Sequence, residues 1–161
     1  MSLLSESAAY QEMLQREAEA KAQREAHQAA QEGAHNSQIE ALVETIYLVA
    51  TADGRFSGSE CEQLSTHVAA LTEGRFNSDE IESMRQNAEG RAGEGLEKRA
   101  HAIAECVTDM DLRRSALLAA SSVAWQDGGV GQKEGLALQT LARAFGIPIN
   151  ELHKIMSEAH G

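Results

Sequence analysis

Four carboxylates stand at matching places in two short turns. Asp53 is followed by Gly54 and then by Glu60, and Asp127 is followed by Gly128 and then by Glu134, so each turn reads Asp-Gly-x-apolar-x-x-x-Glu. Carboxylate oxygens are hard ligands that suit Ca²⁺, Mg²⁺ or Mn²⁺. A divalent-cation site with the candidate ligands Asp53, Glu60, Asp127 and Glu134 is therefore one hypothesis. Two acids alone bind a cation weakly, so such a site needs the two turns to meet, or Asp109 and Asp111 to approach.

A calcium-binding EF-hand is one interpretation of these turns. An EF-hand loop of 12 residues has glycine at position 6, an apolar residue at 8 and a bidentate glutamate at 12, and both turns match these positions. Positions 1 and 3 would be Val49 and Thr51 in the first turn, and Val123 and Trp125 in the second. Because these side chains lack the carboxylate or amide oxygens that normally bind calcium there, any cation site must have another geometry.

The same residues also have a purely structural interpretation. Gly54 and Gly128 can adopt a positive φ where the preceding helix ends. Ser57 and Glu60 fit the S-x-x-E pattern of a capping box, in which each side chain bonds the backbone amide of the other residue. The second turn has glycine in place of that serine, so Glu134 is predicted to be a lone acid in the first turn of its helix. On this interpretation the acids stabilise helix N-termini without a metal.

Helices are predicted on both sides of each turn, because apolar residues recur at helical spacing. In 39–52, one face carries Leu42, Val43, Ile46 and Val49. Further helices are predicted at 60–71, from 78 onward, at 96–107, 111–125 and 134–145, and from 148 onward. Trp125 is expected at the edge of the core, beside the second turn. The expected fold is a compact, all-α bundle of about seven to eight helices.

An internal repeat links the two halves of this bundle. The offset of 74 residues that aligns the turns also aligns the helices around them. It pairs Ala50 with Ala124, Asp53 with Asp127, Glu60 with Glu134, Leu64 with Leu138, and Leu71 with Phe145. We therefore predict a duplicated helix–turn–helix unit with an approximate two-fold relation, with repeats at about 37–90 and 95–161.

Residues 1–36 differ from the rest of the chain. They are rich in Ala, Glu and Gln, which favour helix, but large apolar residues occur only as far as Leu14. The helix is predicted to end between Gly33 and Ser37, with Ser37 capping the next one. The chain is thus divided into an N-terminal helix or linker, 1–36, and a helical bundle, 37–161.

Composition and charge exclude several classes of function. The chain has 161 residues and a net charge of −11, with ten acidic and three basic residues in 37–90. Nucleic acid is a poor partner for such a surface, because phosphate contacts need clustered Lys and Arg. The two cysteines, Cys61 and Cys106, form no C-x-x-C pair, and no catalytic or phosphate-binding motif occurs. No secretory signal and no membrane-spanning run is visible, so a non-enzymatic cytoplasmic protein without membrane insertion is expected.

The segments 50–60 and 124–134, each followed by a leucine-patterned helix, resemble the TerB-like superfamily named for a bacterial tellurite-resistance protein. The resemblance covers about 37–160. It implies a compact helical bundle, and it implies metal binding by shared acids, which correspond here to Asp53, Glu60, Asp127 and Glu134. Leu118 stands where the repeat would match Glu44, so the second half lacks an acid at that position.

Two functions follow from this resemblance and from the charge balance. The first is a non-enzymatic domain of a bacterial stress-response or envelope-associated assembly, modulated by a divalent cation. The second is a metal-free scaffold that binds a protein partner through its N-terminal helix or through an apolar groove. The resemblance implies a protein partner, which is associated with the membrane in some relatives, and self-association is a further expectation.

Overall fold

The computed structural model describes residues 3–54, 56–126 and 129–160. It divides into two compact units, Met1–Ser37 and Gln38–Gly161. One helix, α1 (Leu3–Ala50), extends from the first unit into the second.

In the first unit, α1 is a solvent-exposed helix. Its strong helix formers are reinforced by ion pairs one turn apart, Arg16–Glu12 at 2.8 Å and Lys21–Glu25 at 3.9 Å. The predicted helix end between Gly33 and Ser37 is wrong. The Ser37 hydroxyl donates a hydrogen bond to the Gly33 carbonyl at 3.0 Å, one turn earlier in the same helix, instead of capping a new helix. A glycine inside a helix costs only about 1 kcal/mol, which the helix formers on either side outweigh.

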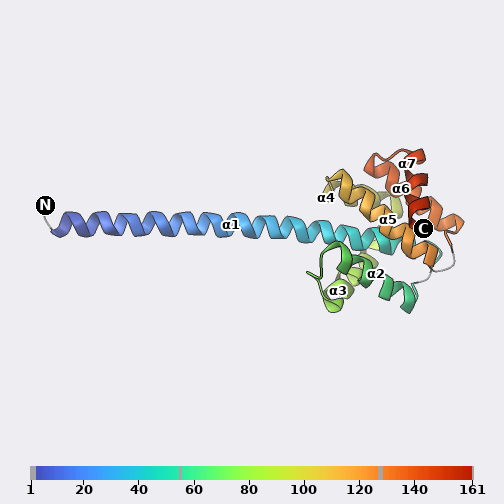
Figure 1. Ribbon diagram of the computed structural model, residues 1–161, viewed down its shortest axis with the longest axis horizontal. Coiled ribbons are helices and arrows are strands. Elements are labelled where there is room, and N and C mark those ends of the chain that lie inside the picture. Colours follow the sequence, from blue (N-terminus) through green and yellow to red (C-terminus); the bar gives the residue numbers. More distant parts are fainter. Residues whose placement is uncertain (1–2, 55, 127–128, 161) are drawn as a thin grey trace. The chain divides into compact units, whose positions relative to one another are not determined.

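The second unit confirms the all-α prediction for the part of the chain described. After α1 come α2 (Gly58–Leu71), α3 (Ser78–Arg91), the 3₁₀ turn η1 (Ala92–Glu94), α4 (Leu96–Cys106), α5 (Met110–Gln126), α6 (Gln132–Phe145) and α7 (Ile149–His160). Within this unit the last turns of α1, from Gln38 on, lie among the other helices (Figure 1). None of the described helices is both long enough and apolar enough to cross a bilayer.

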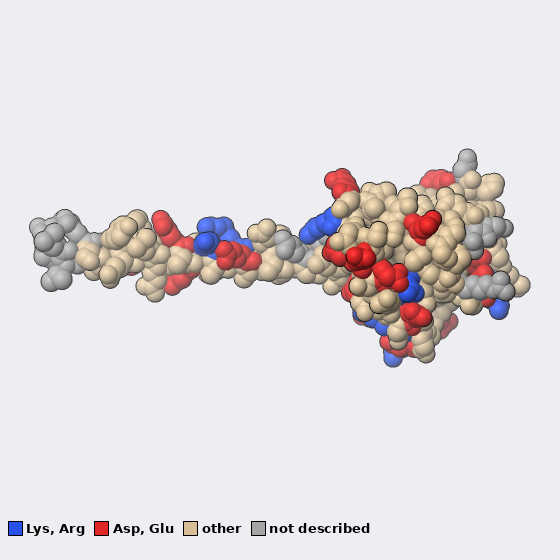
Figure 2. All heavy atoms as spheres, turned by 90° about the horizontal axis from the view of Figure 1, so that it is seen from below, with Lys and Arg blue, Asp and Glu red and all other residues tan. Residues whose placement is uncertain are grey.

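Charged side chains are scattered over the visible face of this bundle (Figure 2). On the face shown in Figure 2, Asp and Glu are spread over the surface of the second unit, with fewer Lys and Arg between them. This distribution agrees with the net charge of −11.

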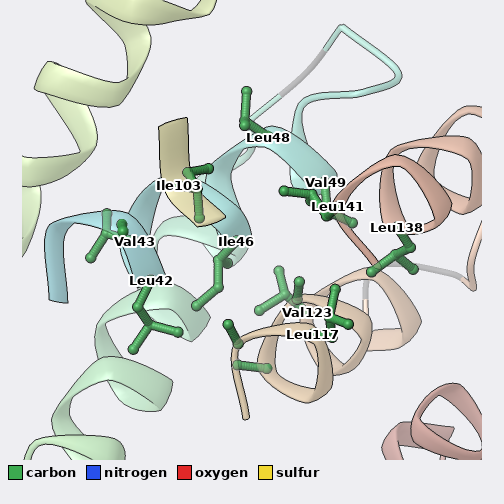
Figure 3. Packing of buried hydrophobic residues seen from close by; sticks show 14 of the residues in the cluster. Leu42, Val43, Ile46, Leu48, Val49, Ile103, Leu117, Val123, Leu138 and Leu141 are labelled. Carbon is green, nitrogen blue, oxygen red and sulfur yellow. The ribbon is translucent and has the colours of Figure 1, made fainter. Parts of the chain in front are cut away.

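The core of the bundle is built from aliphatic side chains of several helices. Leu42 and Ile46 of α1 lie close to Leu117 and Val123 of α5 (Figure 3). Ile103 of α4 and Leu138 and Leu141 of α6 complete this part of the cluster, and all seven side chains are at most 1% exposed. The apolar face predicted for 39–52 is therefore buried.

Two of the helices match the predicted offset. The bounds of α2, Gly58 and Leu71, and those of α6, Gln132 and Phe145, each differ by 74 residues. The spatial two-fold relation between the halves stays a prediction.

Candidate functional site

The first Asp-Gly turn follows directly from the end of α1. Thr51 N–H bonds the Tyr47 carbonyl at 2.9 Å, and Gly54 N–H bonds the Thr51 carbonyl at 2.8 Å. Gly54 has a φ of 91°, which a residue with a side chain rarely adopts, so the prediction for this glycine is confirmed. Phe56 then packs against the core and brings the chain back to the start of α2.

The predicted capping box is present at the start of α2. Glu60 N–H bonds Ser57 Oγ at 3.0 Å, and Ser57 N–H bonds Glu60 Oε1 at 3.1 Å. Glu60 is only 2% exposed, so its carboxylate has left water for a place beside the helix N-terminus. A buried carboxylate needs such donors, and the positive end of the helix dipole favours its charge.

At the second turn, Asp127 and Gly128 lie outside the described residues. Glu134 is 9% exposed, and its Oε1 accepts a hydrogen bond from Gly131 N–H at 3.3 Å. Gly131 has no side chain, so only this half of a capping box can form, as the sequence predicts. Both described glutamates of the turns therefore interact with helix N-termini.

Asp53 has a different environment from Glu60, because it is exposed and lies in the turn itself. Among the residues described, no three His, Cys, Asp or Glu side chains are close enough together to hold a metal ion. The cation prediction for Asp53, Glu60, Asp127 and Glu134 stays a prediction.

A cleft lies beside the first turn, and we call it the first-turn cleft. Its volume is about 630 Å³. It is lined by residues from the end of α1, the turn, the start of α2, and α3 with the residue after it: Tyr47, Thr51, Gly54, Phe56, Ser57, Gly58, Cys61, Glu82, Arg85, Glu89 and Ala92. The turn thus positions one wall of the cleft, and α3 supplies the charged wall.

Arg85 organises that charged wall. Its Nη2 lies 2.6 Å from Glu82 Oε1, and its Nη1 lies 3.3 Å from Glu89 Oε2. Its guanidinium also lies 5.5 Å from the centre of the Phe56 ring and 5.9 Å from that of Tyr47. Hydrogen bonding to Glu82 is the main reason why the pKa of Arg85 is raised, and the same bonding lowers the pKa of Glu82.

Cys61 donates its thiol proton toward Glu82 Oε2, with 3.4 Å between the two heavy atoms. Burial, followed by the hydrogen bond and charge of Glu82, raises the pKa of the thiol. A nucleophilic cysteine needs the opposite shift, because the thiolate is the reactive form.

Sequence reasoning missed the charged wall of this cleft. Glu82, Arg85 and Glu89 stand at i, i+3 and i+7 on α3, and that spacing is a readable signal for ion pairs along one helix face. The stacking of Arg85 on two rings from the α1–α2 segment depends on tertiary packing and has no local signal.

Glu44 is an acid that the sequence left without a role. It is 1% exposed, and Arg99 of α4 binds it with two hydrogen bonds, Nε–Oε2 at 2.6 Å and Nη2–Oε1 at 2.8 Å. This pair joins α1 to α4. Glu44 therefore has a structural role as the partner of Arg99. Leu118, which matches Glu44 in the repeat, carries no acid.

A smaller cleft of about 330 Å³ lies next to the second turn, and we call it the second-turn cleft. The described residues lining it are Trp125, His153, Met156, Ser157 and His160. Trp125 is half-buried, as expected for the edge of the core.

Comparison with known proteins identifies one family. The family model described as "Tellurite resistance protein TerB" matches residues 39–157, which include α2–α6, most of α7 and the end of α1. No curated protein and no solved structure matches the chain. The match spans well over half of the chain and both Asp-Gly turns, and the chain therefore belongs to the TerB family.

Proposed function

We propose that this protein is a non-enzymatic TerB-family domain of a bacterial stress-response assembly, and that it binds a basic segment of a protein partner in the first-turn cleft. The family description supports the link to stress through tellurite resistance. The observation that carries the binding proposal is the pair of carboxylates on the charged wall of the cleft.

Those carboxylates are accessible to a partner. The side chains of Glu82 and Glu89 are 38% and 61% exposed, whereas Arg85 between them is 15% exposed. With two carboxylates and one guanidinium, this wall carries a net negative charge. A Lys or Arg side chain of a partner is the complementary group, and the net charge of −11 would attract a basic segment.

The aromatic residues of the cleft suit the same occupant. Tyr47 and Phe56 have ring centres 5.2 Å apart, and they already carry the guanidinium of Arg85. Rings that accept one cation on their faces can pack against the aliphatic stem of another basic side chain nearby.

The chemistry of the site supports a binding role more than catalysis. Glu60 and Glu134 both accept backbone N–H groups at helix starts, which accounts for their burial. The raised pKa of Cys61 keeps its thiol protonated at neutral pH. We therefore expect the acids to stabilise the fold and the cleft wall to recognise the partner.

The test is a titration of ¹⁵N-labelled protein with a short Lys/Arg-rich peptide at low salt. We expect chemical-shift changes centred on Tyr47, Thr51, Phe56 and Arg85. Glu89→Gln should weaken binding by roughly two- to fivefold, the range of an exposed charge pair. Glu105→Gln removes the same charge from an exposed site on α4 and should leave binding unchanged. Equal effects of the two variants, or shifts scattered over the acidic surface, would disprove the proposed cleft.

A further inference from the structure

We propose that the second-turn cleft binds one soft monovalent cation of the Cu(I) class, between the thioether of Met156 and the imidazole of His160, against the indole ring of Trp125. The proposal rests on three side chains that the structure brings together around one turn of α7.

The structure places these three residues around the same cleft. Met156 and His160 are four residues apart on α7, the spacing at which helical side chains are neighbours. Trp125 Nε1 donates a hydrogen bond to the Met156 carbonyl at 3.1 Å, which fixes the indole against this turn of α7. The ring centres of Trp125 and His160 are 4.2 Å apart, with an angle of 52° between the planes.

Met156 of α7 packs against the core and also lines the cleft. Leu152 and Ile155 are buried, whereas His160 is exposed and Met156 is half-buried. Lys154 and Glu158 of the same helix line a different pocket, together with residues of α5. Met156 and His160 therefore both line the cleft, whereas Lys154 and Glu158 line the other pocket.

The donor set selects the kind of cation. Thioether sulfur favours soft ions such as Cu(I), and imidazole binds them as a neutral ligand. Tryptophan has the most favourable ring face for a cation. The described residues that line the cleft supply no carboxylate, which a Ca²⁺ or Mg²⁺ site would need.

The only tryptophan of the chain reports on this site. Ag(I), a stable probe for Cu(I), is titrated in chloride-free buffer while Trp125 fluorescence is recorded. The experiment uses the Cys61→Ser/Cys106→Ser protein, because thiolates would compete for the cation, and its circular dichroism is first compared with that of the wild type. We expect saturable quenching at one equivalent. Met156→Leu and His160→Gln should each weaken binding about tenfold or more.

A matched control and a second readout separate ligation from altered packing. Met84→Leu removes the thioether of another half-buried methionine, on α3, and should bind Ag(I) like the parent. In protein with ¹³C-labelled methionine methyls, the Met156 signal should shift among the five methionines, while that of Met84 stays in place. Quenching that does not saturate, an unmoved Met156 methyl, or unchanged binding by Met156→Leu would overturn the proposal.

Discussion

At the scale of single residues, Arg113 of α5 connects the ends of two helices. Its guanidinium donates to the carbonyls of Val107 at 2.5 Å, Ala104 at 2.8 Å and Phe145 at 2.9 Å. These groups lie at the C-terminal ends of α4 and α6, where backbone carbonyls have no partner within their own helix. The planar guanidinium can reach all three at once, and no other side chain has that donor geometry.

We predict that Arg113→Lys destabilises the protein by about 2–4 kcal/mol, because a single ammonium cannot satisfy three partly buried carbonyls in different directions. The measurement is urea unfolding followed by circular dichroism. Arg114→Lys is the matched control, since Arg114 is 44% exposed and pairs with Glu151 at the surface. Its cost should stay below about 1 kcal/mol. If Arg113→Lys costs as little as Arg114→Lys, Arg113 acts only through its charge, which lysine retains.

At the scale of elements, substitutions at the start of α2 distinguish the two interpretations of the turn acids, helix capping and cation binding. Glu60→Ala removes the acceptor for Ser57 N–H and should cost about 1–2 kcal/mol. Glu60→Gln keeps an oxygen acceptor in the same place. If Glu60 acts as a cap, the free energy of unfolding of this variant should lie within about 1 kcal/mol of the wild-type value. Thermal and urea unfolding of both variants measure the difference.

Glu60→Gln, together with Asp53→Asn, also tests the predicted cation site. If Glu60 acts as a cap alone, calorimetric titration with Ca²⁺, Mg²⁺ or Mn²⁺ should give no saturable heat in wild type. Saturable heat that Glu60→Gln and Asp53→Asn both abolish would instead establish a divalent-cation site at the first turn.

Local sequence signals predicted these elements well where the interaction is local. The capping box depends on Ser57 and Glu60 alone, and it was found from their spacing of three residues. The buried face of 39–52 was likewise visible in its apolar periodicity. The predicted helix end between Gly33 and Ser37 was wrong, because the helix formers on both sides of Gly33 outweigh the cost of one glycine. The cleft wall of Arg85 could not be predicted, since its aromatic partners lie 29 and 38 residues earlier in the chain.

At the scale of the whole molecule, acidification has two opposing effects on the stability of the fold. Protonation of carboxylates reduces the self-repulsion of a chain with net charge −11, which favours the folded state. Two groups with lowered pKa values act against this effect. Burial lowers the pKa of His67, and Arg85 lowers that of Glu82. In both cases the unfolded chain takes up a proton at a higher pH than the folded chain does, so stability falls as pH falls.

The two groups act in different pH windows, and His67 can be isolated. Its usual pKa is 6.5, so its contribution is intact above that pH and is lost progressively below it, whereas that of Glu82 is lost only below 4.5. We predict that His67→Gln gains stability relative to wild type as pH falls from 7 to 5, in urea unfolding at each pH. His101→Gln removes an exposed imidazole and should follow the wild-type curve. All three proteins have nearly the same surface charge. The contribution of general charge repulsion to stability therefore cancels when their curves are subtracted. Parallel curves for His67→Gln and wild type would mean that His67 is hydrated in the folded state, and that the part of α2 around it opens to water more readily than its packing implies.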